Sequence, residues 1–77
     1  MIRRDTAEPP SRQLAAIIRS QIESGELAPG ARLPAIMTLA DQYEIAPVTV
    51  RKALDILKRE GLVHGVSGYG TFVVERP

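Results

Sequence analysis

The most restrictive feature of the sequence is a pair of amphipathic segments separated by only three residues. The first, residues 35–43, predicts a short helix because its apolar side chains recur at i, i+3, i+4 and i+7. These side chains are Ile36, Leu39, Ala40 and Tyr43. The second begins at Pro47, whose fixed φ and missing N–H suit the first turn of a helix, and runs to residue 60. Two helices joined so closely must turn sharply and pack through their apolar faces.

The longer of these predicted helices, residues 47–60, has two different faces. At about 100° per residue, one side gathers the apolar residues Val50, Ala53, Leu54 and Leu57. The opposite side gathers Val48, Lys52, Asp55 and Arg59, with Arg51 on its flank. Gly61 is the expected end of the helix. The apolar side should face the core, which leaves the outer side near the N-terminal end free.

A further helix is predicted before this pair. Ser11 is a suitable N-cap, and the apolar residues that follow at helical spacing are Leu14, Ile17, Ile18 and Ile22. Ser24-Gly25 ends the pattern. Residues 1–10 close on two prolines and are predicted to be an extended, flexible leader. Residues 26–34 contain a Pro-Gly turn signal and are interpreted as a connector.

After Gly61 the apolar period changes from helical to strand-like. Two β-rich runs, residues 62–64 and 71–74, flank a glycine-rich centre at residues 65–70, which predicts a hairpin. An isolated hairpin is marginal in water, so this one should lie against the helices. The predicted class is mainly α with a small β-hairpin (α+β): a winged helix-turn-helix domain over residues 11–74, with three helices and a two-stranded wing. Residues 75–77 are then a tail or the start of a linker.

Composition excludes several classes of function. The 77 residues suit one small domain, and they include no cysteine and one histidine, His64. Disulfides, thiolate nucleophiles and a Cys/His metal site are therefore excluded, and we expect no cofactor. No nucleophile–base pairing or phosphate-binding loop appears, so we expect no enzymatic activity. No apolar run approaches the ~20 residues of a membrane span and no signal peptide is present, so we expect a cytoplasmic protein without a membrane partner.

Charge alone does not indicate a nucleic-acid partner. The net charge is only +1, with basic character near both ends of the chain and acidic residues in the middle. An ordinary solvated surface and a phosphate-binding footprint both remain open on this evidence.

Three segments of the sequence form a longer pattern. They are Ile18-x-x-x-Ile22-x-Ser24-Gly25-x-Leu27-x-Pro29-Gly30-x-x-Leu33-Pro34, then Thr49-Val50-Arg51-x-Ala53-Leu54-x-x-Leu57-x-x-Glu60-Gly61-Leu62-Val63, then Gly68-x-Gly70-Thr71-Phe72-Val73. In this order they resemble the DNA-binding domain of the GntR family of bacterial transcription regulators. The resemblance covers residues 11–74. It implies a homodimer that binds double-stranded DNA at a palindromic operator, usually as a repressor, and that is associated with the bacterial nucleoid when bound.

Two departures from the family pattern concern function. After Leu33-Pro34 the family usually has Ser-Glu-Arg, where Ser caps a helix and Arg contacts DNA, and here the run is Ala35-Ile36-Met37. Before Thr49 the family usually has a small polar residue and an Arg, and here the run is Ala46-Pro47-Val48. Of three family arginines only Arg51 is present, so the usual operator of the family is not implied.

Candidate DNA contacts lie first at the start of the helix 47–60. Arg51 can bind guanine or a phosphate, or it is a solvated charge paired with Asp55 four residues on. Val48 can contact a thymine methyl group, or it is ordinary exposed apolar surface. Thr49 can donate to a phosphate or bond its own helix, and Lys52 is a phosphate contact or a surface cation. Pro47 lies in the same exposed first turn.

The remaining candidates lie outside that helix. Met37 can fill the core, touch a base or lie in a dimer seam, and these alternatives stay open. Ser67, Gly68 and Tyr69 form the predicted wing tip, where Gly68 permits close approach to the sugar-phosphate backbone or minor groove, or simply turns the hairpin. His64 is interpreted as a packed or solvated strand residue rather than a switch.

Two functions therefore compete. The first is a sequence-specific DNA-binding regulator with helix 47–60 in the major groove and the 65–70 wing on the backbone or minor groove. The second is a winged-helix protein-interaction module that has lost specific DNA recognition. Family members normally carry a larger C-terminal effector domain, and we expect no small-molecule effector site within these 77 residues.

Overall fold

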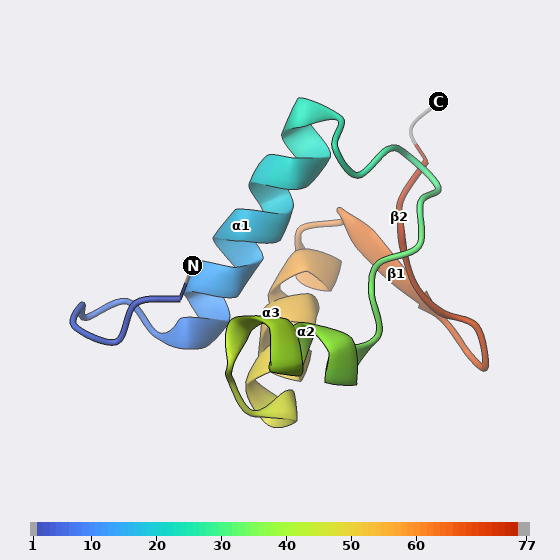
Figure 1. Cartoon of the computed structure of the whole chain (residues 1–77). Coiled ribbons are helices and arrows are strands. Elements are labelled where there is room, and N and C mark those ends of the chain that lie inside the picture. The colour runs from blue at the N-terminus through green and yellow to red at the C-terminus, as the bar shows by residue number, and fades with distance from the viewer. Residues whose placement is uncertain (1, 76–77) are drawn as a thin grey trace.

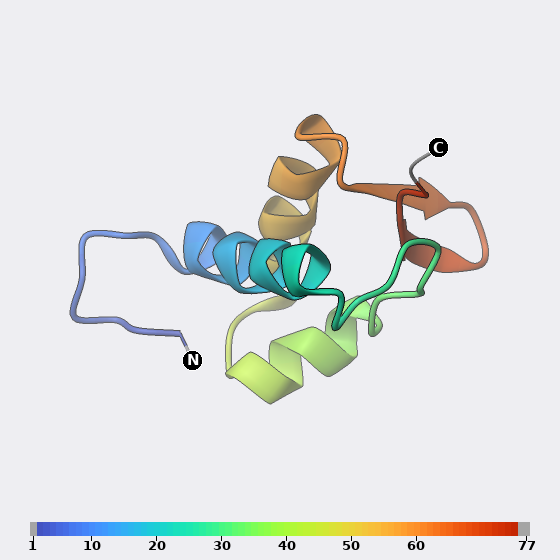
Figure 2. The same cartoon turned by 90° about the horizontal axis from the view of Figure 1, so that it is seen from above.

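The computed structural model describes residues 2–75 as three helices followed by an antiparallel hairpin (Figure 1). The elements are α1 (Pro10–Ser24), α2 (Ile36–Tyr43), α3 (Pro47–Arg59), β1 (Val63–Val66) and β2 (Gly70–Val73). The predicted α+β class and the winged helix-turn-helix are confirmed. Seen from above, the hairpin and the N-terminal segment project on opposite sides of the helices (Figure 2).

Helix α3 is the central element, because α1, α2 and β1 all contact it. Its inward side chains Val50 and Leu57 are fully buried, together with Leu14 and Ile18 from α1. Leu39 of α2 is also buried in this core. The apolar side of α3 therefore faces inward, as its sequence pattern predicts.

The helices begin without side-chain caps. α1 begins at Pro10 after Pro9, so the prediction of Ser11 as its N-cap is wrong. Pro10 suits the first helical position because its φ is preset, and the Pro9 carbonyl accepts hydrogen bonds from the N–H groups of Arg12 and Gln13. The N-cap of α2 is Ala35, and a methyl side chain leaves the first N–H groups of that helix without a side-chain partner.

The turn between α2 and α3 is tight. Glu44 has a left-handed backbone with φ of 55°, which ends α2. The N–H of Ile45 donates to the carbonyl of Ala40 at 3.0 Å, and the Ile45 side chain is buried. This anchor sends the chain directly into Pro47 and sets the direction in which α3 begins.

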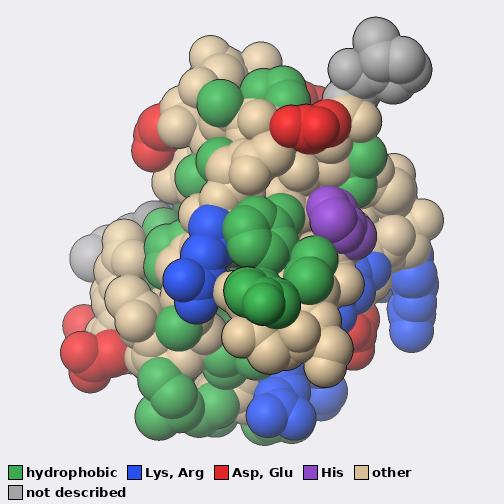
Figure 3. All heavy atoms as spheres, turned by 90° about the vertical axis from the view of Figure 1, so that its right-hand side faces the viewer, with side chains coloured by type: hydrophobic (Ala, Val, Ile, Leu, Met, Phe, Trp, Pro, Cys, Tyr) green, Lys and Arg blue, Asp and Glu red, His purple; other side chains and the backbone are tan. Residues whose placement is uncertain are grey.

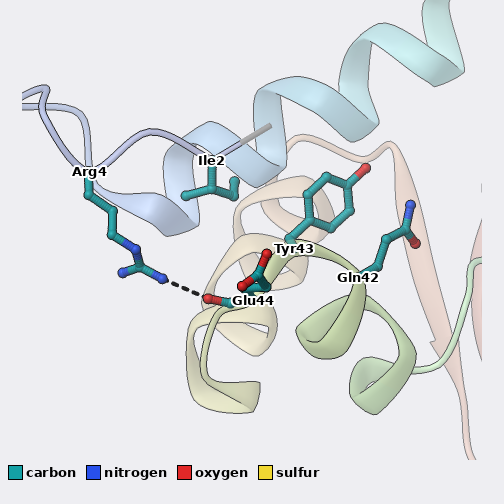
Figure 4. Close-up of a pocket in the computed structure, with 5 residues that line it drawn as sticks. All are labelled: Ile2, Arg4, Gln42, Tyr43 and Glu44. Carbon is teal, nitrogen blue, oxygen red and sulfur yellow. Dashed lines mark hydrogen bonds between the residues drawn. The ribbon is translucent and has the colours of Figure 1, made fainter.

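The N-terminal segment differs from the extended leader that the sequence predicts. Ile2 packs against the core, and Gln13 of α1 hydrogen-bonds the backbone of Arg3. The guanidinium of Arg4 donates to the carbonyl oxygen of Glu44 at 2.6 Å, at the edge of a hollow lined partly by Tyr43 (Figure 4). The N-terminal segment therefore folds back onto the turn between α2 and α3. The flexibility of this segment and the domain limits at residues 11 and 74 stay predictions.

The strands of the hairpin are longer toward the tip than the sequence predicts. Val63 pairs with Val73 and Val66 with Gly70, so the tip is residues 67–69 rather than the whole stretch 65–70. Gly65 pairs with Thr71 within the ladder, and Gly70 begins β2 with a φ of 118°, a conformation that favours glycine.

The missing cap of α2 gives a stability prediction. Replacing Ala35 by Ser supplies an oxygen for an unsatisfied N–H, so Ala35→Ser should raise the free energy of unfolding by about 1 kcal/mol in urea denaturation. Leu39 N–H already bonds the Ala35 carbonyl, so the helix start need not move. Ala28→Ser, in the connector, is the control and should leave the free energy unchanged. An equal effect of both substitutions would contradict the capping explanation.

An ion pair between α1 and the end of α3 gives a pH prediction. The Arg19 guanidinium donates to Glu60 at 2.7 and 2.8 Å, and this hydrogen bond lowers the pKa of Glu60. A carboxylate with a lowered folded-state pKa stabilises the fold above its unfolded pKa, and this contribution is lost as pH falls through the folded value. Glu60→Gln should therefore be slightly less stable than wild type at pH 7. The deficit should vanish below about pH 3, and a deficit that persists there would contradict the assignment.

Candidate nucleic-acid interface

The first turns of α3 form an exposed surface above a buried helix face. Val48 is 58% exposed, and Arg51 and Lys52 are also exposed. Thr49 is half-buried, and Pro47 is exposed at the first helical position. The structure therefore places all five predicted residues of α3 at one end of the helix, outside the core.

Arg51 carries a charge without a salt-bridge or hydrogen-bond partner among residues 2–75. Across residues 2–75 the salt bridges are Arg3–Asp5 and Arg19–Glu60, so the alternative that Arg51 pairs with Asp55 is wrong for this structure. Its guanidinium also makes none of the side-chain hydrogen bonds found in that part of the chain. All five of its N–H donors are available to an outside acceptor.

Thr49 and Met37 are placed where a ligand can reach them. The Thr49 hydroxyl takes part in none of the side-chain hydrogen bonds among the described residues, so the alternative of a bond to its own helix is not realised. Met37, at the second position of α2, is 67% exposed. The alternative of Met37 as core filling is therefore wrong, and a base contact or a dimer seam remains.

The wing tip is a glycine turn that carries an aromatic side chain. The N–H of Tyr69 donates to the Val66 carbonyl at 2.9 Å, and Gly68 has a φ of 80°. A positive φ at the third position of such a turn favours glycine. Tyr69 is 70% exposed, and nothing lies within 4 Å of the place where a Cβ on Gly68 would stand. Gly68 therefore both permits the turn and leaves its outer side open, with Ser67 exposed beside it.

The face of the molecule on the wing side combines apolar surface with positive charge. Figure 3 shows hydrophobic side chains gathered at its centre, with a histidine beside them and Lys and Arg side chains around them. His64 is exposed on β1, and its ring lies tilted against Phe72 with 6.2 Å between centroids, so it is a solvated strand residue beside an aromatic ring. The positive charge on this face is offset by acidic residues elsewhere, because the net charge of the whole chain is only +1.

Arg32 lies on the wing, and the sequence-based prediction did not include it among the candidate DNA contacts. It lies in the connector and forms an antiparallel bridge with Phe72 of β2. The sequence signal that could have found it is the alternation of apolar Ala31, charged Arg32 and apolar Leu33, which is typical of a short strand. A Pro-Gly turn just before these residues concealed that pattern.

Residues 2–75 contain no group of three or more His, Asp or Glu side chains arranged to hold a metal ion. None of the helices in this part of the chain is both long enough and apolar enough to cross a membrane.

Comparison with protein families decides the relationship of this chain. The family model described as "Bacterial regulatory proteins, gntR family" matches residues 10–73, which include every helix and both strands. The chain belongs to the GntR family. The limits of the match agree with the resemblance seen over residues 11–74, and they include the exposed turns of α3 and the wing tip.

Curated GntR-like relatives are longer than this chain. The repressor NagR of Bacillus subtilis is 43% identical over 61 residues, which are 79% of this chain and 25% of that protein. The mannosyl-D-glycerate transport/metabolism system repressor MngR of Escherichia coli is 41% identical over 68 residues, 88% of this chain and 28% of that protein. The chain thus spans about a quarter of the length of these relatives.

Solved GntR-type structures share the whole architecture. A crystal structure of "AraR(DBD) in complex with operator ORX1" has a TM-score of 0.88 at 30% identity and covers 96% of this chain and 93% of that one. YtrA of Sulfolobus acidocaldarius, described as a GntR-family transcription factor, has a TM-score of 0.85 at 34% identity and covers 100% of this chain and 80% of that one. The GntR winged-helix fold is therefore shown along the described chain.

Proposed function

We propose that this chain is the sequence-specific DNA-binding domain of a transcription regulator, acting as a repressor. The first turns of α3 enter the major groove, and the wing tip lies against the backbone or in the minor groove. The observation that carries the proposal is the exposed guanidinium of Arg51, which has no partner among the described residues and lies on a helix whose other side is buried in the core. Membership of the GntR family and the likeness to an operator-bound domain support it.

The rigidity of α3 matters for recognition. Val50, Ala53 and Leu57 are fully buried, so the helix cannot rotate without exposing its apolar side. A major groove about 12 Å wide admits a helix, and an arginine at its N-terminal part can donate two bonds to O6 and N7 of guanine. Arg51 is therefore proposed as the guanine contact, with Lys52 and the Thr49 hydroxyl on neighbouring phosphates.

The positions that usually carry arginine in the family are apolar here. These positions are Met37 and Pro47, and neither their side chains nor that of the exposed Val48 can donate a hydrogen bond to a base. Apolar side chains in the major groove can instead contact the methyl group of thymine. We propose that Val48 makes such a contact, so that the half-site combines a guanine with a nearby thymine.

We further propose that the regulator works as a homodimer on a palindromic operator, in the bacterial cytoplasm. The naming of NagR and MngR as repressors and the family match support this role, which is a binding role and not an enzymatic one. Two-fold symmetry of the protein would place two α3 helices on half-sites about one helical turn of DNA apart.

A second candidate function follows from the exposed apolar residues. Met37, Val66 and Tyr69 are unusual on a surface that touches only phosphates, and they favour contact with another protein. The two functions differ in their salt response, because phosphate binding weakens linearly on a logarithmic scale with added salt.

The deciding experiment is selection of bound duplexes from a random pool, followed by binding of the enriched duplex at several salt concentrations. We expect a palindromic site and a steep salt slope. Arg51→Ala should weaken binding by about 1–3 kcal/mol and relax specificity at one base pair of each half-site. Arg59→Ala, an exposed cation in the last turn of α3, is the matched control. Absence of enrichment at low salt by folded protein would overturn DNA recognition and favour the interaction module.

The apolar contact of Val48 can be tested with one methyl group. Replacing each thymine of the selected half-site by deoxyuridine removes only its methyl, and at one position this should weaken binding about fourfold, as expected for about 0.8 kcal/mol. Val48→Ala should bind the thymine and deoxyuridine duplexes equally at that position. If wild type tolerates deoxyuridine at every position, Val48 makes no thymine contact.

A further inference from the structure

The wing has a third extended segment beside its two strands. Phe72 of β2 pairs with His64 of β1 on one side and forms a bridge with Arg32 on the other. The N–H of Leu33 donates to the Thr71 carbonyl at 2.8 Å, and the N–H of Val73 donates to the Ala31 carbonyl at 2.8 Å. These bonds hold the backbone of Arg32 firmly against the hairpin.

The Arg32 side chain lies on the outer face of the wing. Leu33 is 3% exposed and faces the core, and neighbouring residues of an extended chain point to opposite sides. Arg32 therefore shares the outer face with its bridge partner Phe72.

The guanidinium of Arg32 lies over Gly70, which has no side chain to displace it. A Cβ on Gly70 would stand 3.0 Å from Nε and 3.5 Å from Nη2 of Arg32, so the side chain lies directly over this residue. Gly70 follows Tyr69 of the wing tip. The charge of Arg32 is thus held one residue from the tip, and the lack of a side chain at Gly70 makes this position accessible.

The charge held there has no partner among the described residues. Arg32 belongs to neither of the two salt bridges within residues 2–75, and it makes none of the side-chain hydrogen bonds there. A guanidinium presents a planar fork of donors that matches a phosphate. The backbone of Arg32 is already fixed by its bridge to Phe72, which lowers the entropic cost of binding.

We propose that Arg32 binds a DNA backbone phosphate beside the place where the wing tip approaches the duplex. The inference rests on the proposed function and deepens it. Arg32 lies over Gly70 beside the wing tip, and in the chain it precedes the start of α2 at Ile36 by four residues. It supplies positive charge near a surface where Met37 and Pro47 stand in positions that the family usually fills with arginine.

The test measures the salt dependence of binding for wild type, Arg32→Gln and Arg32→Lys on the selected duplex and on a shuffled duplex. One phosphate contact contributes about 0.9 to the slope of log K against log salt. Wild-type affinity should therefore fall about 3.5-fold more than that of Arg32→Gln between 50 and 200 mM salt, while Arg32→Lys keeps the wild-type slope. Arg32→Gln should weaken both duplexes by the same factor, because a phosphate carries no sequence information.

Arg12→Gln is the matched control, since Arg12 is an exposed arginine of α1 beside the groove between α1 and α3 and away from the wing. It should leave the slope unchanged. Thermal denaturation of each variant shows whether the fold is retained. Two results would overturn the assignment of Arg32 and leave the proposed function standing, provided that wild type binds. In the first, Arg32→Gln keeps the full wild-type salt slope. In the second, Arg32→Gln changes sequence specificity rather than overall affinity. If wild type binds neither duplex, the proposed function fails and the assignment fails with it.

Discussion

Burial of the apolar side of α3 is the interaction on which the rest of the structure depends. A helix of 13 residues is marginal by itself in water, and α3 is held by α1, α2 and β1 through residues such as Val50 and Leu57, which are fully buried. Once the apolar side of α3 is buried, the opposite side of its first turns must face solvent. The hairpin, which follows α3 in the chain, must then lie to one side of the helices. The position of every candidate DNA contact follows from this packing.

The domain keeps the GntR fold while the chemistry of its exposed surface has changed. Fold is maintained by core residues, whereas the positions of Met37, Val48 and Pro47 contribute little to packing because they are exposed. Substitutions there leave the core intact. Arg51 keeps a hydrogen-bonding side chain exposed on α3, and the wing offers a second exposed cation at Arg32. We therefore propose that recognition shifts from several arginines on the helices toward apolar contacts and the wing.

Much of this arrangement was predictable from the sequence, because periodic apolar spacing reports which side of a helix is buried. The helix-turn-helix, the end of α1 at Gly25 and the inward residues of α3 are of this kind. Local sequence signals were less informative where they allow two structures. Ser11 and Pro10 can both begin a helix, so the start of α1 was not determined. The glycines at 65 and 70 are compatible with a strand or a loop, so the strand limits were not determined either. The place of Arg32 and the return of Arg4 to Glu44 depend on tertiary contacts between distant residues, which single-sequence patterns do not report.

The central claim is that one surface, formed by the first turns of α3 and the wing tip, meets DNA. Backbone amide NMR signals of the protein, followed as the selected duplex is added, test it most directly. We predict that the signals of Val48–Lys52 and of Ser67–Gly70 shift, while those of Glu23, in the last turn of α1, and of Glu26, just after that helix, stay in place. Shifts concentrated at that end of α1, with α3 and the wing unchanged, would contradict the account.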